Sequence, residues 1–212
     1  MSAPQSYYVP VDAGETEFTE KRSRFLGHVR RVETEAEARA FLDEMRKKYY
    51  DARHNCWCYV LHEGGVVRYG DDGEPQGTAG QPMLNVLQRE GVENVVCVVT
   101  RYFGGVLLGA GGLTRAYAKS AKDALDAAGK ARMRLWSAVT VDCPYPMLER
   151  LKLLAAAHGG TVEGTDFGAA VSVRILLPQE NAAGFDAALT ERPPVTMTVR
   201  REGERFLPGP RE

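Results

Sequence analysis

Residues 95–117 have the sequence Val-Val-Cys-Val-Val-Thr-Arg-Tyr-Phe-Gly-Gly-Val-Leu-Leu-Gly-Ala-Gly-Gly-Leu-Thr-Arg-Ala-Tyr. Residues 95–100 form a nearly continuous apolar run, which is typical of a central strand buried on both faces. After the glycines, apolar residues recur on one helical face from Leu113 to Ala128, and Gly129 ends the pattern. This stretch therefore predicts a central strand, a glycine-rich loop and a helix in succession.

The segments before this stretch mix strands and helices. Residues 15–32 are β-prone and are interrupted by a basic run at 21–24, which predicts a hairpin. A capping box at Thr34 and Glu37 predicts the start of a helix. Residues 56–61 and 66–69 predict two strands, and residues 82–88 predict a short helix that begins at a proline. We expect a first domain, residues 1–131, that contains a mixed sheet with helices.

The pattern of elements restarts after residue 131. Strands are predicted at residues 135–143, 161–165, 169–177 and 195–200, and helices at 147–155 and 182–189. The order β-α-β-β-α-β is that of a ferredoxin-like domain. We therefore predict an α+β protein whose second domain covers residues 132–206. The Pro-Gly-Pro at 208–210 predicts a loose tail over residues 207–212.

Composition narrows the possible function classes. The 212 residues are 44% hydrophobic and 26% charged, which fits a globular chain with a core. The 27 Lys and Arg residues are balanced by 28 Asp and Glu residues, so an RNA-binding hypothesis depends on local clusters. No apolar run is long enough to cross a bilayer, and the first residues do not resemble a signal peptide. Four unpaired cysteines fit a reducing compartment, so we expect a cytoplasmic protein with no membrane partner.

Two glycine-rich loops, at residues 71–83 and 101–117, are candidates for function. Gly109, Gly111 and Gly112 directly precede the predicted helix, where free backbone N–H groups and the helix dipole favour a phosphate. Arg101 and Arg115 would add positive charge there. The alternative is that the glycines only permit tight turns and close packing, because the spacing matches neither a Walker loop nor a dinucleotide fingerprint.

A basic cluster at the predicted hairpin, which includes Lys21, Arg22 and Arg24, is a second candidate. At a hairpin tip these side chains would meet phosphates without being buried. Tyr102 and Phe103 would stack on exposed bases. The alternative is a solvated basic face, balanced by neighbouring glutamates, with one of the two aromatic rings in the core.

Acidic residues and cysteines give only weak support to the hypothesis that the protein is an enzyme. Asp71, Asp72 and Glu74 are potential magnesium ligands, although acidic residues beside Gly and Pro more often make an exposed turn. His54, Cys56 and Cys58 alternate along a predicted strand, but no second Cys/His pair completes a zinc site. We therefore expect the cysteines to fill the core, and we assign no catalytic residue, metal or cofactor.

Four motifs together resemble those of the IMPACT/YigZ family, in the family's order. They are Lys21-Arg-Ser-Arg-Phe25, Asp51-Ala-Arg-His-Asn-Cys56, Asp71-Asp-Gly-Glu-Pro-Gln-Gly-Thr-Ala-Gly80 and Arg101-Tyr-Phe-Gly-Gly-Val-Leu-Leu-Gly109. The resemblance implies a first domain similar to the second domain of a small-subunit ribosomal protein. It also implies a second domain similar to the last domain of elongation factor G. The family-motif positions that we single out are His54, Asp71, Asp72, Glu74, Pro75 and Thr78.

The resemblance also implies a function, because eukaryotic members act in translational control by competing for an activator of a starvation-sensing kinase. Our leading hypothesis is a non-enzymatic protein that binds RNA or the ribosome. The candidate phosphate-binding residues are Lys21, Arg22, Arg24, Arg101, Tyr102, Gly104, Gly105, Gly109, Gly111, Gly112 and Arg115. The alternatives are a magnesium-dependent enzyme that handles phosphates or nucleotides, and a protein-interaction module in translational control.

Overall fold

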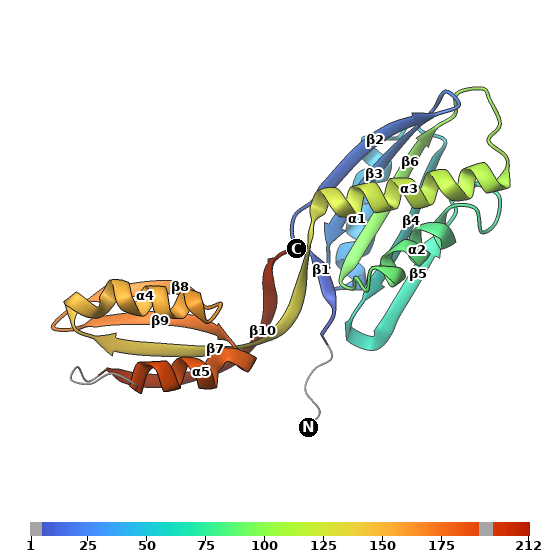
Figure 1. Ribbon diagram of the computed structural model, residues 1–212. Helices are drawn as coiled ribbons and strands as arrows, with labels where there is room; N and C mark the ends of the chain where they lie inside the picture. Colours follow the sequence, from blue (N-terminus) through green and yellow to red (C-terminus); the bar gives the residue numbers. More distant parts are fainter. Residues whose placement is uncertain (1–5, 191–196) are drawn as a thin grey trace. The chain divides into compact units, whose positions relative to one another are not determined.

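The computed structural model describes residues 6–190 and 197–212, which fall into two units (Figure 1). The larger unit consists of Ser6–Arg132 together with Pro208–Glu212, and the smaller unit contains Met133–Leu207. Each has a β-sheet covered by helices, so the predicted two-domain α+β architecture is confirmed. The division between the units lies one residue after the predicted boundary.

The sheet of the larger unit has the strand order β2-β3-β6-β4-β5, and every neighbouring pair is antiparallel. The strands are β2 (Gly14–Glu20), β3 (Ser23–Arg31), β4 (His54–Leu61), β5 (Val66–Gly70) and β6 (Val95–Tyr102). Strand β6 is central and buried along its length except at its last residue, as its apolar run predicts. A short 3-10 turn, η1 (Glu63–Gly65), joins β4 to β5.

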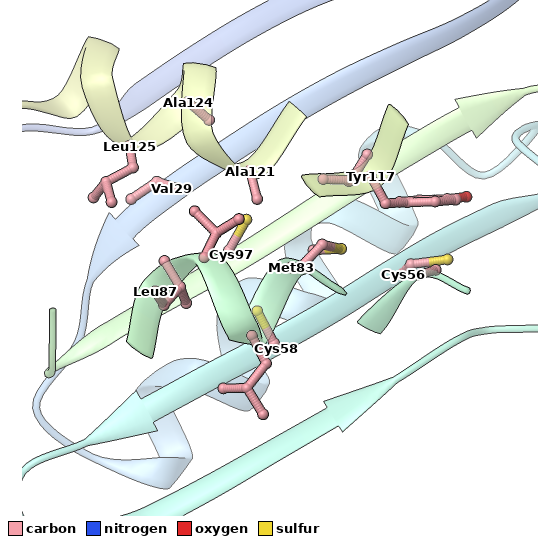
Figure 2. Packing of buried hydrophobic residues seen from close by; sticks show 14 of the residues in the cluster. Val29, Cys56, Cys58, Met83, Leu87, Cys97, Tyr117, Ala121, Ala124 and Leu125 are labelled. Atoms are coloured by element: carbon pink, nitrogen blue, oxygen red, sulfur yellow. The ribbon is translucent and has the colours of Figure 1, made fainter. Parts of the chain in front are cut away.

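Helices cover both faces of this sheet. Helix α1 (Glu35–Lys48) begins at the predicted capping box and packs its apolar side on one face. Helices α2 (Gly80–Arg89) and α3 (Ala110–Ala128) cover the other face. Figure 2 shows this second core, where Leu87 from α2 and Ala121 from α3 surround the Cys97 side chain of β6. A β-carbon on Gly27 would lie 2.6 Å from the carbonyl oxygen of Ser120, so glycine is required where α3 meets β3.

The first and last described segments, residues 6–10 and 208–212, belong to the larger unit. Strand β1 (Tyr8–Pro10) pairs with the beginning of β7 (Lys130–Cys143). Strand β10 (Thr198–Arg211) extends through the segment predicted as a loose tail, so that prediction is wrong. Arg211 forms an ion pair with Asp12 at 3.1 Å and donates to the carbonyl of Ala127 at 3.0 Å. Among residues 6–190 and 197–212, β10 pairs with β7 alone. Proline is tolerated there because an edge strand does not need every N–H for pairing.

The smaller unit contains the predicted β-α-β-β-α-β order. After β7 come η2 (Tyr145–Met147), α4 (Leu148–Ala157), β8 (Thr161–Phe167), β9 (Val171–Pro178), α5 (Gln179–Thr190) and β10. Its strand order, β10-β7-β9-β8, is ferredoxin-like, and Leu151 of α4 and Phe185 of α5 pack against Val139, Val141 and Ile175. Residues 195 and 196 of the predicted final strand lie outside the described residues.

Candidate functional site

A pocket of about 390 Å³ opens where β4 begins and β6 ends. These two points lie together because His54 is paired with Arg101 in the antiparallel register. The loop before α2 contributes Gly73, Glu74 and Pro75 to the wall. The loop after β6 and the start of α3 complete the lining, which also includes Arg53, Phe103, Leu107, Leu108, Gly109, Ala110 and Leu113. The two glycine-rich loops singled out in the sequence therefore meet around one pocket.

A buried ion pair forms part of the pocket lining. Nη1 of Arg101 donates to Oε1 of Glu74 at 2.7 Å, and the two side chains are only 5% and 4% exposed. The Tyr117 hydroxyl donates to the same carboxylate oxygen at 2.8 Å, and Nη2 of Arg101 donates to Oγ of Ser23 at 3.2 Å. Arg101 was predicted to add positive charge to a phosphate site at the glycine-rich loop. The structure instead buries its guanidinium and balances its charge with Glu74.

Two neutral groups lie behind this ion pair. Burial, together with the nearby Cys56 thiol and Glu74 carboxylate, raises the pKa of Tyr117, so its hydroxyl keeps the proton that it donates. Burial likewise raises the pKa of the Cys56 thiol, which donates to the carbonyl of Asp71 at 2.9 Å. A protonated, buried thiol is a poor nucleophile. Cys56 and Cys58 fill the core as predicted (Figure 2).

In the loop before α2, the Asp71 carboxylate is hydrogen-bonded to backbone N–H groups of the same loop and of the start of α2. The Asp71 carboxylate accepts from the N–H groups of Gly77, Ala79 and Gly80 at 2.8, 3.1 and 2.8 Å. The Asp72 carboxylate accepts from the N–H of Asn55 at 2.7 Å. Within residues 6–190 and 197–212, no group of three His, Cys, Asp or Glu side chains is arranged to hold a metal ion. The hydrogen bonds of Asp71 are those of a turn, which was the alternative to a magnesium site for these residues.

Three further motif positions border the pocket or support its wall. Nδ1 of His54 lies 2.8 Å from the carbonyl oxygen of Asp72, which can only accept, so Nδ1 carries a hydrogen. The other ring nitrogen, Nε2, lies 3.9 Å from Oε1 of Glu74. The Thr78 hydroxyl donates to the carbonyl of Pro75 at 2.6 Å and so closes the turn beside the pocket.

The β2–β3 hairpin brings a strained basic turn to the same end of the sheet. Glu20 is paired with Ser23, so Lys21 and Arg22 are the two turn residues, and their φ angles are 45° and 66°. Such two-residue turns normally contain Asn-Gly, because side chains with a β-carbon are strained at positive φ. A β-carbon on Gly104 would lie 2.0 Å from the carbonyl oxygen of Arg22, so the hairpin tip contacts the loop after β6.

Arg115 and Lys21 line a smaller hollow, of about 160 Å³, beside the pocket. Leu108 borders both cavities, and Gly112 borders the hollow. Lys21, Arg22, Arg53 and Arg115 form no ion pair and no side-chain hydrogen bond with any residue that the structure describes. Arg24, by contrast, is paired with Glu17 at 2.8 Å. Of the cations predicted to bind phosphate, the structure thus places Lys21 and Arg115 on one hollow, with Arg22 next to Lys21 in the turn, and pairs Arg24 with Glu17.

The N-terminus of α3 opens into the pocket through Gly109 and Ala110. Gly109 is the N-cap, its φ is 72°, and no side chain caps the first N–H groups of the helix. Helix α1, by comparison, is capped by Thr34 and Glu37. Free N–H groups and the positive end of the dipole attract anions at such a position. Gly111 and Gly112 were predicted to precede the helix, but α3 begins at Ala110, so they lie in its first turn.

The two aromatic candidates have different environments. The Tyr102 hydroxyl donates to Asp51 at 2.8 Å, and burial with the neighbouring carboxylate raises the pKa of Tyr102 to about 12. Phe103 lines the pocket and is 43% exposed, with the guanidinium of Arg101 5.4 Å from its ring centroid. Gly105 has a φ of 82° and no neighbour that a β-carbon would touch.

The sequence reasoning missed Arg53, Leu107 and the supporting Tyr117. Arg53 is adjacent to His54 within a recognised motif, which is the one signal that would have found it. Tyr117 was treated only as a helix-face residue, because nothing local links it to Glu74.

Two family models match the chain. The Impact N-terminal domain matches residues 21–125, and a domain of unknown function, DUF1949, matches residues 141–192. YigZ of Escherichia coli is 36% identical over 174 residues, which cover 81% of this chain and 85% of that protein. This chain belongs to the IMPACT family. The four motifs therefore predicted the family correctly.

A second relative and a solved structure are also similar to this chain. YvyE of Bacillus subtilis is 43% identical over 148 residues, 69% of this chain and 68% of that one. The crystal structure of a hypothetical protein is 32% identical, covers 96% of this chain and 100% of its own, and has a TM-score of 0.59. The Impact N-terminal match contains the whole pocket and the hairpin tip.

No helix among the described residues has the length and apolar character needed to span a membrane.

Proposed function

We propose that this IMPACT-family protein binds RNA at the pocket end of its larger unit, and that it acts in the control of translation through this binding. The observation that carries the proposal is that Arg53 lines the pocket at the N-terminus of α3 while Lys21 and Arg115 line the adjoining hollow. Arg22 follows Lys21 in the hairpin turn. These side chains are exposed and have no acidic partner among the residues described. Cations in this state contact phosphates without first breaking an ion pair.

The strained hairpin tip supports the same proposal. Each non-glycine residue held at positive φ costs about 1–3 kcal/mol. Lys21 and Arg22 occupy both such positions, although Asn-Gly would relieve the strain. Strain of this kind clusters at functional sites because the structure around it must maintain it. A role of the Lys21 and Arg22 side chains in binding would explain why this strain is maintained.

The family supports the link to translation, since the eukaryotic members that these motifs resemble act in translational control. A second candidate, a protein-binding role in the same process, is favoured by the apolar rim of the pocket. Leu107 is 81% exposed and Phe103 is 43% exposed. Exposed apolar side chains that lie side by side are typical of protein interfaces.

RNA binding can be tested by filter binding of full-length protein with single-stranded RNA across a salt series. Four cationic contacts predict a slope of log affinity against log salt of about −3. The variant Lys21→Asn, Arg22→Gly, Arg115→Gln should lower affinity by about tenfold or more and reduce the slope by about 2. The double variant Lys21→Asn, Arg22→Gly relaxes the strained turn, so by itself it should raise the free energy of unfolding by about 1–2 kcal/mol.

The matched control is Lys47→Gln, Arg68→Gln, Arg89→Gln, which removes three exposed cations that form no ion pair within 4 Å among the described residues and do not line the pocket. Its affinity should stay within about twofold of wild type. Absence of RNA affinity at low salt, or equal losses in the two triple variants, would refute the proposal. The protein-binding role would then be favoured if a partner protein still co-purifies after nuclease treatment and no longer co-purifies with the Leu107→Ser variant.

A further inference from the structure

We infer that the free edge of β5 in the larger unit binds an extended segment of a partner protein, in which acidic and apolar residues alternate. This inference goes beyond RNA binding and concerns another surface of the same unit. Strand β5 ends the strand order of the sheet, and it pairs with β4 alone among the residues that the structure describes (Figure 1). An open edge presents N–H and C=O groups, with which an extended peptide pairs as an added strand.

The two edges of this sheet differ in how they are protected against strand addition. Strand β2, at the other edge, exposes Glu15, Glu17 and Glu20, and charged side chains on an edge strand discourage further pairing. Strand β5 has the sequence Val-Val-Arg-Tyr-Gly, with one charged residue and no proline. Its pairing with β4 is regular over all five residues, without a bulge. The sheet is therefore open to an added strand at β5.

A hollow lies on each face of β5. Val67 is opposite Val60, which packs in the core with α2 and α3, whereas Arg68 is opposite Tyr59, which packs in the core with α1. Val67 lines a hollow of about 280 Å³, and Arg68 lines one of about 400 Å³. Side chains of an added strand alternate between the same two faces, so alternate residues of the peptide would lie at the two hollows.

The hollow at Val67, the valine hollow, fits an apolar side chain. Its wall includes Val60, Val67 and Val92. The carboxylate at its rim, that of Glu93, already lies 2.5 Å from Nδ1 of His62. An apolar side chain that contacts the three valines would lose its exposure to water without burying an unpaired charge.

The hollow at Arg68, the arginine hollow, has more positive than negative charge. Three arginines and two carboxylates line it, and they are Arg39, Arg46, Arg68, Glu35 and Asp43. Arg39 donates to Glu35 at 2.8 Å, whereas the charged atoms of Arg46 and Asp43 are 3.8 Å apart, too far for a hydrogen bond. Arg68 is exposed and forms no ion pair with any described residue. A peptide carboxylate beside Arg68 would form a favourable cross-strand pair of opposite charges.

The same charge distinguishes an acidic partner from a second copy of this chain. Two antiparallel β5 strands centred on their middle residue would place Arg68 opposite the Arg68 of the other copy. Like charges directly opposite each other destabilise a sheet. Charge complementarity therefore favours an acidic segment of a different protein.

Short synthetic peptides, blocked at both ends, test the inference by fluorescence anisotropy with the full-length protein. A peptide that alternates glutamate and valine should bind, and one that alternates lysine and valine should bind about fivefold or more weakly. Two further glutamate–valine peptides carry N-methyl groups on every glutamate or on every valine. Alternate N–H groups of an extended strand point to opposite edges, so one of these two peptides should lose binding and the other should keep it. No binding of the glutamate–valine peptide, equal affinity of the glutamate and lysine peptides, or equal affinity of the two N-methylated peptides would overturn the inference.

Two charge-reversal variants locate the site. Arg68→Glu should weaken binding of the glutamate–valine peptide by about fivefold or more and strengthen binding of the lysine–valine peptide. The matched control, Lys47→Glu, reverses an exposed cation that forms no ion pair with a described residue and lines neither hollow, and its affinity should stay within about twofold of wild type. Equal losses in the two variants would show attraction by overall charge alone and overturn the inference.

Sedimentation of the chain without peptide separates a second copy from a different partner. A dimer that Arg68→Glu dissociates would show that a second copy covers β5, and this result would also overturn the inference. Each of these failures would leave RNA binding standing, because no residue that lines the pocket at the start of α3 lines either hollow beside β5.

Discussion

Replacing Arg101 by methionine removes the cation of the buried ion pair while keeping most of the side-chain volume. The Arg101 and Glu74 side chains are 5% and 4% exposed and their charged atoms lie 2.7 Å apart. At an effective dielectric constant of about 20, this separation corresponds to an attraction of about 6 kcal/mol, which offsets the cost of burying both charges. Without Arg101, the Glu74 carboxylate stays buried and retains only the Tyr117 hydroxyl as a donor.

We therefore expect Arg101→Met to lower the free energy of unfolding of the larger unit by about 3–5 kcal/mol. This loss is a large part of the roughly 5–15 kcal/mol that stabilises a typical domain. The double variant Arg101→Met, Glu74→Gln should recover most of it, because no buried charge is left uncompensated. The surface pair of Arg24 and Glu17, whose side chains are 51% and 49% exposed, provides the control, and Arg24→Met should cost less than about 1 kcal/mol.

The assay is urea denaturation of the full-length chain followed by tryptophan fluorescence. The two tryptophans lie in different units, Trp57 in the larger and Trp136 in the smaller. A Trp136→Phe background makes the signal report on the larger unit alone. The reasoning is refuted if Arg101→Met costs no more than Arg24→Met, or if the double variant is as unstable as the single one.

Three further predictions test other contacts. Burial lowers the pKa of His28, with Lys48 acting in the same direction and Glu15, at 3.6 Å, in the opposite one. As pH falls, His28 is therefore protonated in the unfolded chain before it is protonated in the folded one. The free energy of unfolding should consequently fall as pH drops below about 6.5. Urea titrations should show a smaller decrease in the variant His28→Leu. Gly104→Ala should lower the free energy of unfolding by about 1–3 kcal/mol, because its β-carbon would clash with the hairpin tip. In Gly111→Ala the β-carbon would contact only the end of the Arg115 side chain, so thermal melting should show no loss of stability. Asp71→Ala should cost about 2–4 kcal/mol and speed hydrogen exchange at Gly80, because three N–H groups lose their acceptor; a melting temperature of the wild type that rises with magnesium would contradict this structural role.

Several elements were predictable because their signals are local. The capping box at Thr34 marked the start of α1, and the apolar run of residues 95–100 marked β6 as the central strand. The order of elements in the second half indicated a ferredoxin-like sheet before its strand pairing was known. The tail was predicted wrongly because Pro208 and Pro210 suggest a break locally, whereas the ion pair of Arg211 that holds the strand end involves a residue at the other end of the sequence.

The candidate site shows the limit of the same reasoning. The sequence by itself determined the family, the local elements and the presence of two glycine-rich loops, since motifs, caps and periodicity act within a few residues of one another. Only the tertiary structure decided which cations are free. Arg101 and Arg115 look alike in the sequence, but Arg101, at the end of β6, contacts Glu74 of the distant loop before α2, while Arg115 is exposed on α3. Charge neutralisation depends on contacts between residues far apart in the chain, and no local pattern contains that information.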